Sequence, residues 1–222
     1  MISSPIPIFP LGLVLLPGAT VPLHIFEPRY RVMIDEVNGS TKRFGIIAPP
    51  ADSNEADLPP GRIGCIALLS SVELLPDGRS YIVVEGTERF RFETFIDAGT
   101  PYRVGHIAAW IDRPESAEAL AESAGRVRAT ALRAISASMT VHDATNDPPT
   151  LSADPAALSF QIAQLIRVGV EVQYDLLADQ SALSRLERVE ALLRAGLPRV
   201  EAAAELHVRA KTNGHHHGPP PT

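Results

Sequence analysis

Five prolines divide the apolar N-terminal stretch of this 222-residue chain into short runs. They stand at positions 5, 7, 10, 17 and 22, and the short apolar runs of this stretch, separated by Pro and Gly, cover residues 6–9, 13–16 and 21–26. Proline fixes φ and removes a backbone donor, so it ends or bends strands and breaks helices. No apolar run approaches the roughly 20 residues of a membrane span, and no basic residue precedes Arg29 as a signal peptide would require. The stretch therefore predicts short strands, in a protein without a membrane segment that we expect in the cytoplasm.

The β-rich pattern continues to residue 110 and is interrupted by one predicted helix. That helix begins at Pro28, with Glu27 as a possible cap, places Tyr30, Met33, Ile34 and Val37 on one face, and ends at Asn38-Gly39. Further strands are predicted over 44–48, 62–75, 80–85, 87–96 and 102–110, with a turn at 76–78 and a bulge at Gly86. In the strand over 87–96, Phe90 and Phe92 alternate with Arg89 and Arg91, which predicts one buried face.

Past residue 112 the pattern changes to helical. An Ala-rich helix is predicted over 115–138 with a buried stripe, and a second begins at Asp154-Pro155. A short segment over 172–177 and a helix from Ser181 follow; Gly196 is expected to end that helix and Pro198 to begin another. The buried stripe is formed by Leu120, Val127, Ala131, Leu132 and Ile135.

The resulting class is α+β with segregated elements. We expect a β-rich part over 1–112, a helical part over 113–211 and a disordered tail over 212–222.

Several sequence blocks resemble the N-terminal substrate-binding domain of Lon proteases, in the order found in that family, over roughly residues 5 to 195. They are IPIFPL at 6–11, LLPG at 15–18, PLHIFEPRY at 22–30, RIGCIA at 62–67, VEGTERF at 84–90, FQIA at 160–163, QYDLL at 173–177 and RL at 185–186. The resemblance implies a PUA-like β pseudo-barrel followed by a helical bundle. It also implies that the chain binds unfolded or degron-bearing polypeptides, as an adaptor in protein quality control or with a protease partner.

The sequence departs from full-length Lon in lacking catalytic machinery. No Walker A segment is present, and neither of its two lysines stands near a plausible nucleophilic serine. We therefore expect a free-standing, non-enzymatic module without catalytic residues or cofactors. PUA-like folds also bind RNA, and an RNA-binding protein is the alternative; the net charge of −6 disfavours nucleic acid as a partner.

A charged and aromatic set is the candidate polypeptide-binding site. It consists of Phe26, Glu27, Arg29, Tyr30, Glu85 and Arg89. The charged members, together with Glu88, could line a groove that grips a peptide. A structural role is the favoured interpretation, with Glu27 capping the helix and both arginines paired to carboxylates across the barrel.

The remaining reactive residue types predict no site. Cys65 lies within an apolar run and is expected to be a buried structural thiol. Single histidines are scattered at 24, 106, 142 and 207 without the spacing of a zinc site, and the cluster at 215–217 falls in the tail. His142-Asp143 is interpreted as a polar loop because no nucleophile elbow accompanies it. We therefore predict no metal site.

Overall fold

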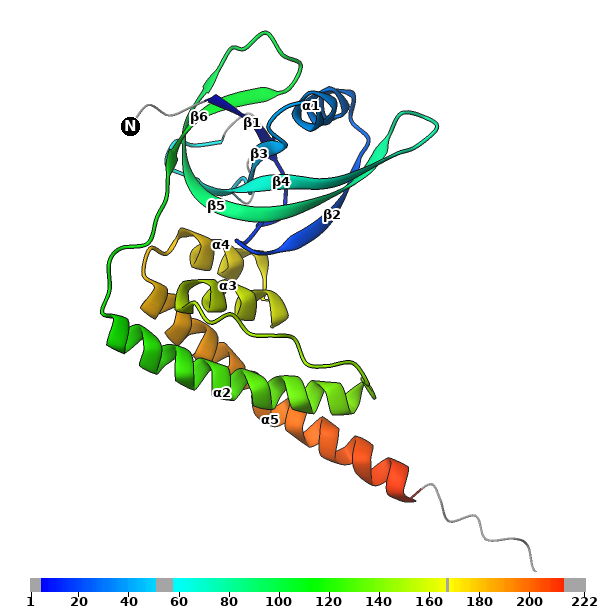
Figure 1. The fold of residues 1–222 in the computed structure, drawn as a ribbon, viewed down its shortest axis with the longest axis vertical. Helices are drawn as coiled ribbons and strands as arrows, with labels where there is room; N and C mark the ends of the chain where they lie inside the picture. Colours follow the sequence, from blue (N-terminus) through cyan, green and yellow to red (C-terminus); the bar gives the residue numbers. More distant parts are fainter. Residues whose placement is uncertain (1–4, 51–57, 167, 214–222) are drawn as a thin grey trace, which may run out of the picture. The chain divides into compact units, whose positions relative to one another are not determined.

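The structure is a computed structural model that describes residues 5–50, 58–166 and 168–213 (Figure 1). Its strands are β1 Pro5–Pro10, β2 Thr20–Ile25, β3 Arg43–Ile47, β4 Ile63–Leu74, β5 Ser80–Ile96 and β6 Arg103–Ala109. Its helices are α1 Pro28–Asn38, α2 Ala117–Val141, α3 Pro155–Leu165, α4 Val170–Ala178 and α5 Ala182–Asn213. A β-rich N-terminal part followed by helices confirms the predicted α+β class.

The six strands form one sheet that closes into a barrel. Their order is β2-β5-β4-β3-β1-β6, and an additional pairing of β5 with β6 joins the two sides of the ring. β1 and β3 are parallel, whereas the other pairs are antiparallel. The long strand β5 pairs with three strands: β4 lies along one edge, and on the other edge its first residues pair with β2 and its last residues pair with β6. β2 therefore lies outside the closed ring, on the edge of β5.

The break predicted at Gly86 is a register shift within one continuous strand. The pairing of β4 with β5 shifts between Cys65↔Arg89 and Ala67↔Gly86, which is the signature of a bulge. Gly86 also lies against the backbone of the preceding loop: a Cβ built there would stand 2.3 Å from the Leu16 carbonyl oxygen. Glycine is required at this position because nothing larger fits.

The barrel interior is filled by the apolar positions that the alternation predicts. Phe90 and Phe92 are buried in a cluster with Ile8, Ile47 and Ile66. The period-two prediction for this strand is thus confirmed for its inner face. On the outer face Arg91 is exposed, but Arg89 is only 7% exposed, because an adjoining helix covers it.

Helix α1 matches its prediction closely. It begins at Pro28, and the four apolar positions assigned to one face (30, 33, 34 and 37) are all buried. Glu27 occupies the N-cap position, but its side chain makes no capping hydrogen bond. Glu27 therefore stands at the expected cap position but does not cap the helix through its side chain.

Two compact units divide the chain. The first comprises 1–114 and 163–181, and the second comprises 115–162 and 182–222. Helix α4 therefore belongs to the β unit, although the chain reaches it from the helical part. The simpler division at residue 112 stays a proposal from the sequence. The first two residues of the predicted disordered tail, 212 and 213, belong to helix α5, and the rest of it, 214–222, lies outside the described residues.

In the helical unit, α2 and α5 pack along their apolar stripes. Val127 and Ala131 of α2 are buried as predicted, whereas Leu132, assigned to the same stripe, is 47% exposed. Leu132 directly follows Ala131 in the helix, so its side chain points away from the face that carries Ala131. Its assignment to the buried stripe is therefore wrong. Helix α2 is capped by Ser116, whose hydroxyl accepts from the Ala119 amide.

The predicted stop at Gly196 and restart at Pro198 are wrong. Helix α5 continues through both residues to Asn213, with Pro198 inside it. Leu193, Leu197 and Ala204 are buried at helical spacing on both sides of the glycine. Packing of this continuous stripe outweighs the low intrinsic propensity of the two breakers. Among the described residues, no helix combines the length and the apolar character that a membrane crossing requires.

Candidate functional site

The mouth of the barrel holds a cavity of about 730 Å³. Its apolar floor is formed by Ile6, Ile66, Phe90 and Ile107, which also belong to the barrel core or pack against it. Its polar rim carries Glu36 of α1, Arg43 of β3, Glu88 of β5 and Tyr102. A concave apolar surface with a few polar groups at its margin is the usual form of a binding site, and barrel mouths are a frequent location.

The mouth is open because two strands separate there. β1 pairs in parallel with β3 from Ile8↔Gly45 onward, whereas its first residues, Pro5 to Pro7, pair with β6 alone. Pro5 and Pro7 have no backbone N–H, so this part of β1 cannot supply the donors of a continuous ladder on both sides. The prolines that punctuate the sequence thus leave a gap in the wall of the barrel.

The rim carboxylates are held by fixed partners. The Tyr102 hydroxyl donates to Glu36, and burial together with this bond raises the pKa of Tyr102 to about 12. Glu88 accepts from the Thr87 hydroxyl at 2.7 Å and from Arg43 at 2.5 Å, and these two bonds lower its pKa. At neutral pH the rim therefore presents a neutral phenol, an ionised Glu88 and a paired arginine around an apolar floor.

Arg89 lines the back of this cavity, and its guanidinium makes structural hydrogen bonds within the protein. Its Nη1 donates to the carbonyl oxygens of Leu177 at 2.8 Å and Asp179 at 2.6 Å, and its Nη2 pairs with Asp112. Nearby, Trp110 Nε1 donates to the Ala178 oxygen at 2.9 Å. These bonds satisfy carbonyls at the end of α4, where a cation is also favoured by the helix dipole. Arg89 and Trp110 thus fasten α4 to the barrel.

Of the six residues of the sequence-based site, Glu27, Arg29 and Tyr30 lie together, with the Arg29 guanidinium 4.5 Å from the centroid of the Tyr30 ring. Arg89 lines the barrel mouth and is buried, while Tyr30 is 2% exposed and packs against the tilted ring of Phe9, with centroids 4.1 Å apart. Arg29 pairs with Glu27 two residues away at 2.8 Å. The last two members, Phe26 and Glu85, are exposed. As a polypeptide-binding set the six residues remain a prediction.

Most of the barrel-mouth residues have no sequence pattern that marks them as a site. Ile6 and Ile107 looked like ordinary strand positions, and Glu36 lay on the polar face of its helix. The available signal was the Pro5-Ile6-Pro7 alternation, since proline at alternate strand positions indicates an unpaired edge. What brings Glu36 to Tyr102 is the closure of the barrel, which no local pattern encodes.

Cys65 is the buried thiol that the sequence predicted. It is completely buried, and burial raises its pKa to about 12, so it is neither ionised nor accessible. Among the described residues, no three His, Cys, Asp or Glu side chains gather as metal ligands would. The histidines at 215–217 lie outside those residues.

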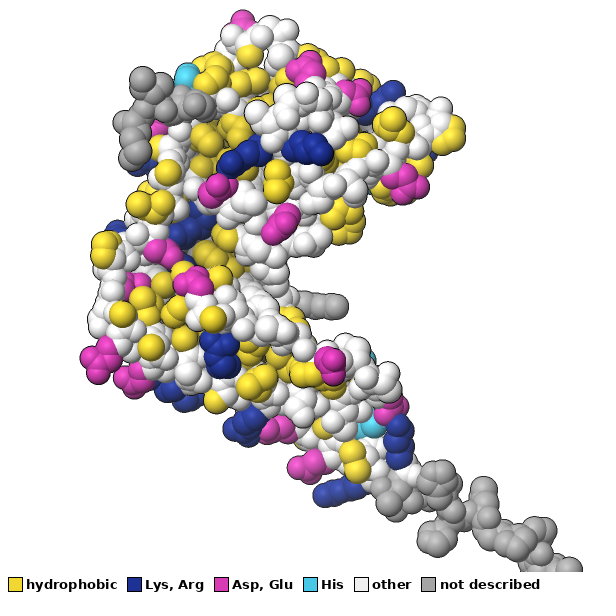
Figure 2. All heavy atoms as spheres, viewed as in Figure 1, with side chains coloured by type: hydrophobic (Ala, Val, Ile, Leu, Met, Phe, Trp, Pro, Cys, Tyr) yellow, Lys and Arg dark blue, Asp and Glu magenta, His cyan; other side chains and the backbone are white. Residues whose placement is uncertain are grey.

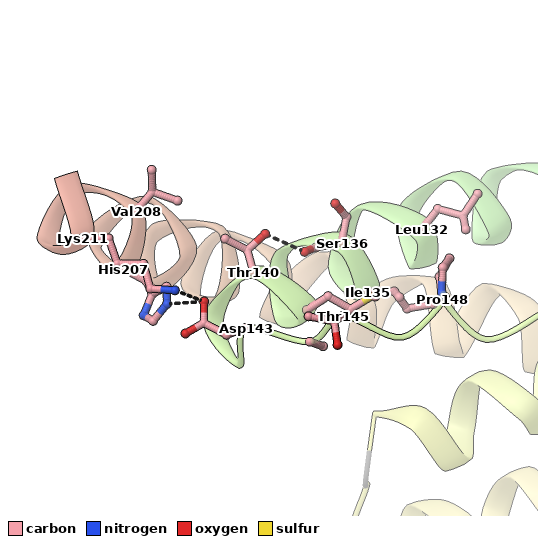
Figure 3. A pocket seen from close by; sticks show the side chains of 12 residues that line it. Leu132, Ile135, Ser136, Thr140, Asp143, Thr145, Pro148, His207, Val208 and Lys211 are labelled. Atoms are coloured by element: carbon pink, nitrogen blue, oxygen red, sulfur yellow. Dashed lines mark hydrogen bonds and ion pairs between the residues drawn. The ribbon is translucent and has the colours of Figure 1, made fainter.

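The helical unit has a hollow of its own, of about 780 Å³ (Figure 3). Asp143, in the loop after α2, accepts from His207 at 3.0 Å and from Lys211, both on α5. These two bonds lower the pKa of Asp143. His142 instead bonds the Ser138 carbonyl of its own helix. The cluster ties the loop after α2 to the end of α5.

Comparison with known proteins identifies what this architecture is similar to. The family model of the ATP-dependent protease La (LON) substrate-binding domain matches residues 5–195. A Lon protease of Desulfosudis oleivorans is 30% identical over 95 residues, covering 41% of this chain and 12% of that protein. Lon protease 4 of Sorangium cellulosum is 27% identical over 219 residues, covering 95% of this chain and 25% of that protein. The chain thus spans a quarter or less of these two relatives.

Two solved structures share the fold. A Lon N-terminal domain protein from Xanthomonas campestris superposes with a TM-score of 0.59 at 22% identity, covering 85% of this chain and 98% of that one. The N-terminal domain of the Mycobacterium avium complex Lon protease superposes with a TM-score of 0.64 at 18% identity, covering 86% and 98%. At these identities the likeness concerns the fold alone.

Proposed function

The chain belongs to the family of ATP-dependent protease La (LON) substrate-binding domains, and from this premise we propose that it binds polypeptides through its barrel mouth. The observation that carries the proposal is the apolar cavity of about 730 Å³ at the point where β1 and β3 separate. Its size suits one or two apolar side chains of an unfolded client. The paired charges at its rim keep the opening hydrated and the floor accessible.

The client is an unfolded or degron-bearing segment and not a nucleic acid. Figure 2 shows Lys and Arg side chains interspersed with Asp and Glu on the visible face, without one continuous basic surface. An acidic chain with net charge −6 gains little from the counterion release that drives nucleic-acid binding. We also propose that the module acts as an adaptor, which holds the bound segment for a separate protease.

Fluorescence anisotropy with fluorescein-labelled casein tests the binding site. Ala109 pairs with Phe90 across β6 and β5 and lines the mouth, so Ala109→Phe fills the cavity. We expect this variant to weaken casein binding by at least about tenfold, which corresponds to about 1.4 kcal/mol. Ile6→Ser, which makes the floor polar, should have a similar effect by an independent change.

The matched control is Ala121→Phe, the same substitution at an exposed position of α2. It should bind casein like the wild type. Urea unfolding followed by the fluorescence of Trp110 establishes that each variant is folded. If both mouth variants fold and bind casein with unchanged affinity, the barrel mouth is not the binding site.

A further inference from the structure

The strand β2 has one edge without a strand partner among the described residues. It stands at the end of the strand order and pairs with β5 alone, outside the ring that the other strands close. An unpaired edge presents backbone N–H and C=O groups that another chain can pair with. This edge is separate from the barrel mouth, because no residue of β2 lines that cavity.

The register shows which backbone groups face outward. Just before β2, the Gly86 amide donates to the Ala19 carbonyl at 2.8 Å. Because hydrogen-bonded pairs alternate along an antiparallel ladder, the next residues bonded to β5 are 21, 23 and 25. The backbone groups of Thr20, Pro22 and His24 therefore point to the open edge. Pro22 supplies an acceptor only, so the edge offers donors at Thr20 and His24 and acceptors at all three residues.

Aromatic side chains flank this edge on the outer face of the sheet. The His24 ring lies 4.8 Å from the Tyr81 ring and 5.7 Å from the Phe26 ring, measured between centroids. Phe26 is 58% exposed and Tyr81 is 50% exposed. Exposed aromatic rings beside an open strand edge form a surface on which alternate side chains of an added strand can lie.

The same face is acidic. Glu85 of β5 and Glu73 of β4 are exposed, and the segments 20–25, 71–74 and 80–85 contain no lysine or arginine. The nearest arginine in sequence, Arg79, is paired with Asp77 at 2.6 Å. A partner with Lys or Arg on this face would meet two carboxylates and the faces of aromatic rings, both of which attract cations.

We propose that β2 captures an extended client segment as an added strand, with basic side chains lying over the His24–Phe26–Tyr81 face. The proposal rests on the polypeptide-binding function above and names the class of segment: extended, with Lys or Arg at alternate positions. A second copy of this chain fits the edge poorly. Pairing of two β2 edges would bring like-charged faces together and would lose a donor at Pro22 on each strand.

The test uses a short labelled peptide that alternates Lys and Val, in three forms. One is unmodified, one is N-methylated at every lysine and one at every valine. In an added strand, alternate N–H groups point toward β2, so methylation of one set should abolish binding and methylation of the other should leave it within about twofold. Equal effects of the two methylated forms would refute strand addition.

Protein variants locate the contact. Tyr81→Ala and Glu85→Lys should each lower the affinity for the Lys-Val peptide by about fivefold to tenfold. The variant Ala109→Phe should leave it unchanged. A Glu-Val peptide should bind weakly to the wild type and better to Glu85→Lys. If neither Tyr81→Ala nor Glu85→Lys changes the affinity for the Lys-Val peptide, the peptide does not bind at the β2 edge and the proposal is overturned.

The outcome for casein keeps the two proposals distinct. If casein fails to bind at all, the proposed function fails. If casein binds and responds to Ala109→Phe while the methylated peptides behave alike, only the β2 proposal fails. Concentration-dependent dimers in sedimentation that Tyr81→Ala abolishes would assign the edge to a second copy and overturn the proposal.

Discussion

Replacing Arg89 by alanine should detach α4 from the barrel. The guanidinium bonds two carbonyl oxygens, of Leu177 and Asp179, and pairs with Asp112, while the arginine side chain itself is 5% exposed. Alanine would remove all three contacts at once and leave the two carbonyls near the end of α4 without their donor.

The magnitude follows from these contacts. A hydrogen bond to a charged group contributes about 1.5–3 kcal/mol, and breaking a buried ion pair from one side costs about 3–5 kcal/mol. Asp112 is 26% exposed and can be rehydrated, so the contributions do not simply add. We expect Arg89→Ala to lower the free energy of unfolding by about 3–5 kcal/mol. Arg89→Lys keeps the charge but cannot reach three acceptors, and should lose about half as much.

Urea unfolding at constant pH measures the effect, with Trp110 fluorescence as the signal. Trp110 is the only tryptophan of the chain, and its indole donates to the Ala178 carbonyl, so its emission reports the docking of α4 directly. The control is Arg91→Ala on the same strand. Arg91 is exposed and its oxygen partner on Glu93 lies 3.5 Å away, so its loss should cost less than about 1 kcal/mol. Equal stability of the Arg89→Ala and Arg91→Ala proteins would refute the assigned role of Arg89.

Three further outcomes follow from the structure. The Cys65 thiol, with a pKa of about 12, should stay unreactive toward a thiol reagent at pH 8 and react only after urea unfolding; rapid modification of the native protein would contradict its burial. The raised pKa of Tyr102, about 12, means that the folded state holds this proton more tightly than the unfolded state. Its contribution to stability is present below about pH 10 and is lost as pH rises through 12; unfolding curves for Tyr102→Phe should lack that loss. Gly86→Ala should destabilise the fold by about 2–3 kcal/mol, because its Cβ would stand 2.3 Å from the Leu16 oxygen, while Gly125→Ala, in open space on α2, should stabilise it by about 0.5–1 kcal/mol. Thermal unfolding of the two glycine variants compares them directly.

The local elements and the class of fold follow from the amino-acid sequence alone. Prolines and short apolar runs predicted the strands, and the 30, 33, 34 and 37 spacing predicted α1 with its buried face. These features depend on backbone chemistry and on the side-chain period within one element, both of which are local. The same reasoning identified Cys65 as buried and the outer side of β5 as charged, without indicating that Arg89 would be covered.

The positions of the polar groups and the surfaces that remain open depend on how distant parts of the chain pack together. Arg89 is buried because residues 163–181 return to the barrel, and the mouth exists because β1 and β3 diverge after closure of the ring. Helix α5 runs through Gly196 and Pro198 because α2 packs along its whole stripe. Each outcome depends on residues far apart in the sequence, and the free energy of such contacts exceeds the local preferences from which a sequence is interpreted.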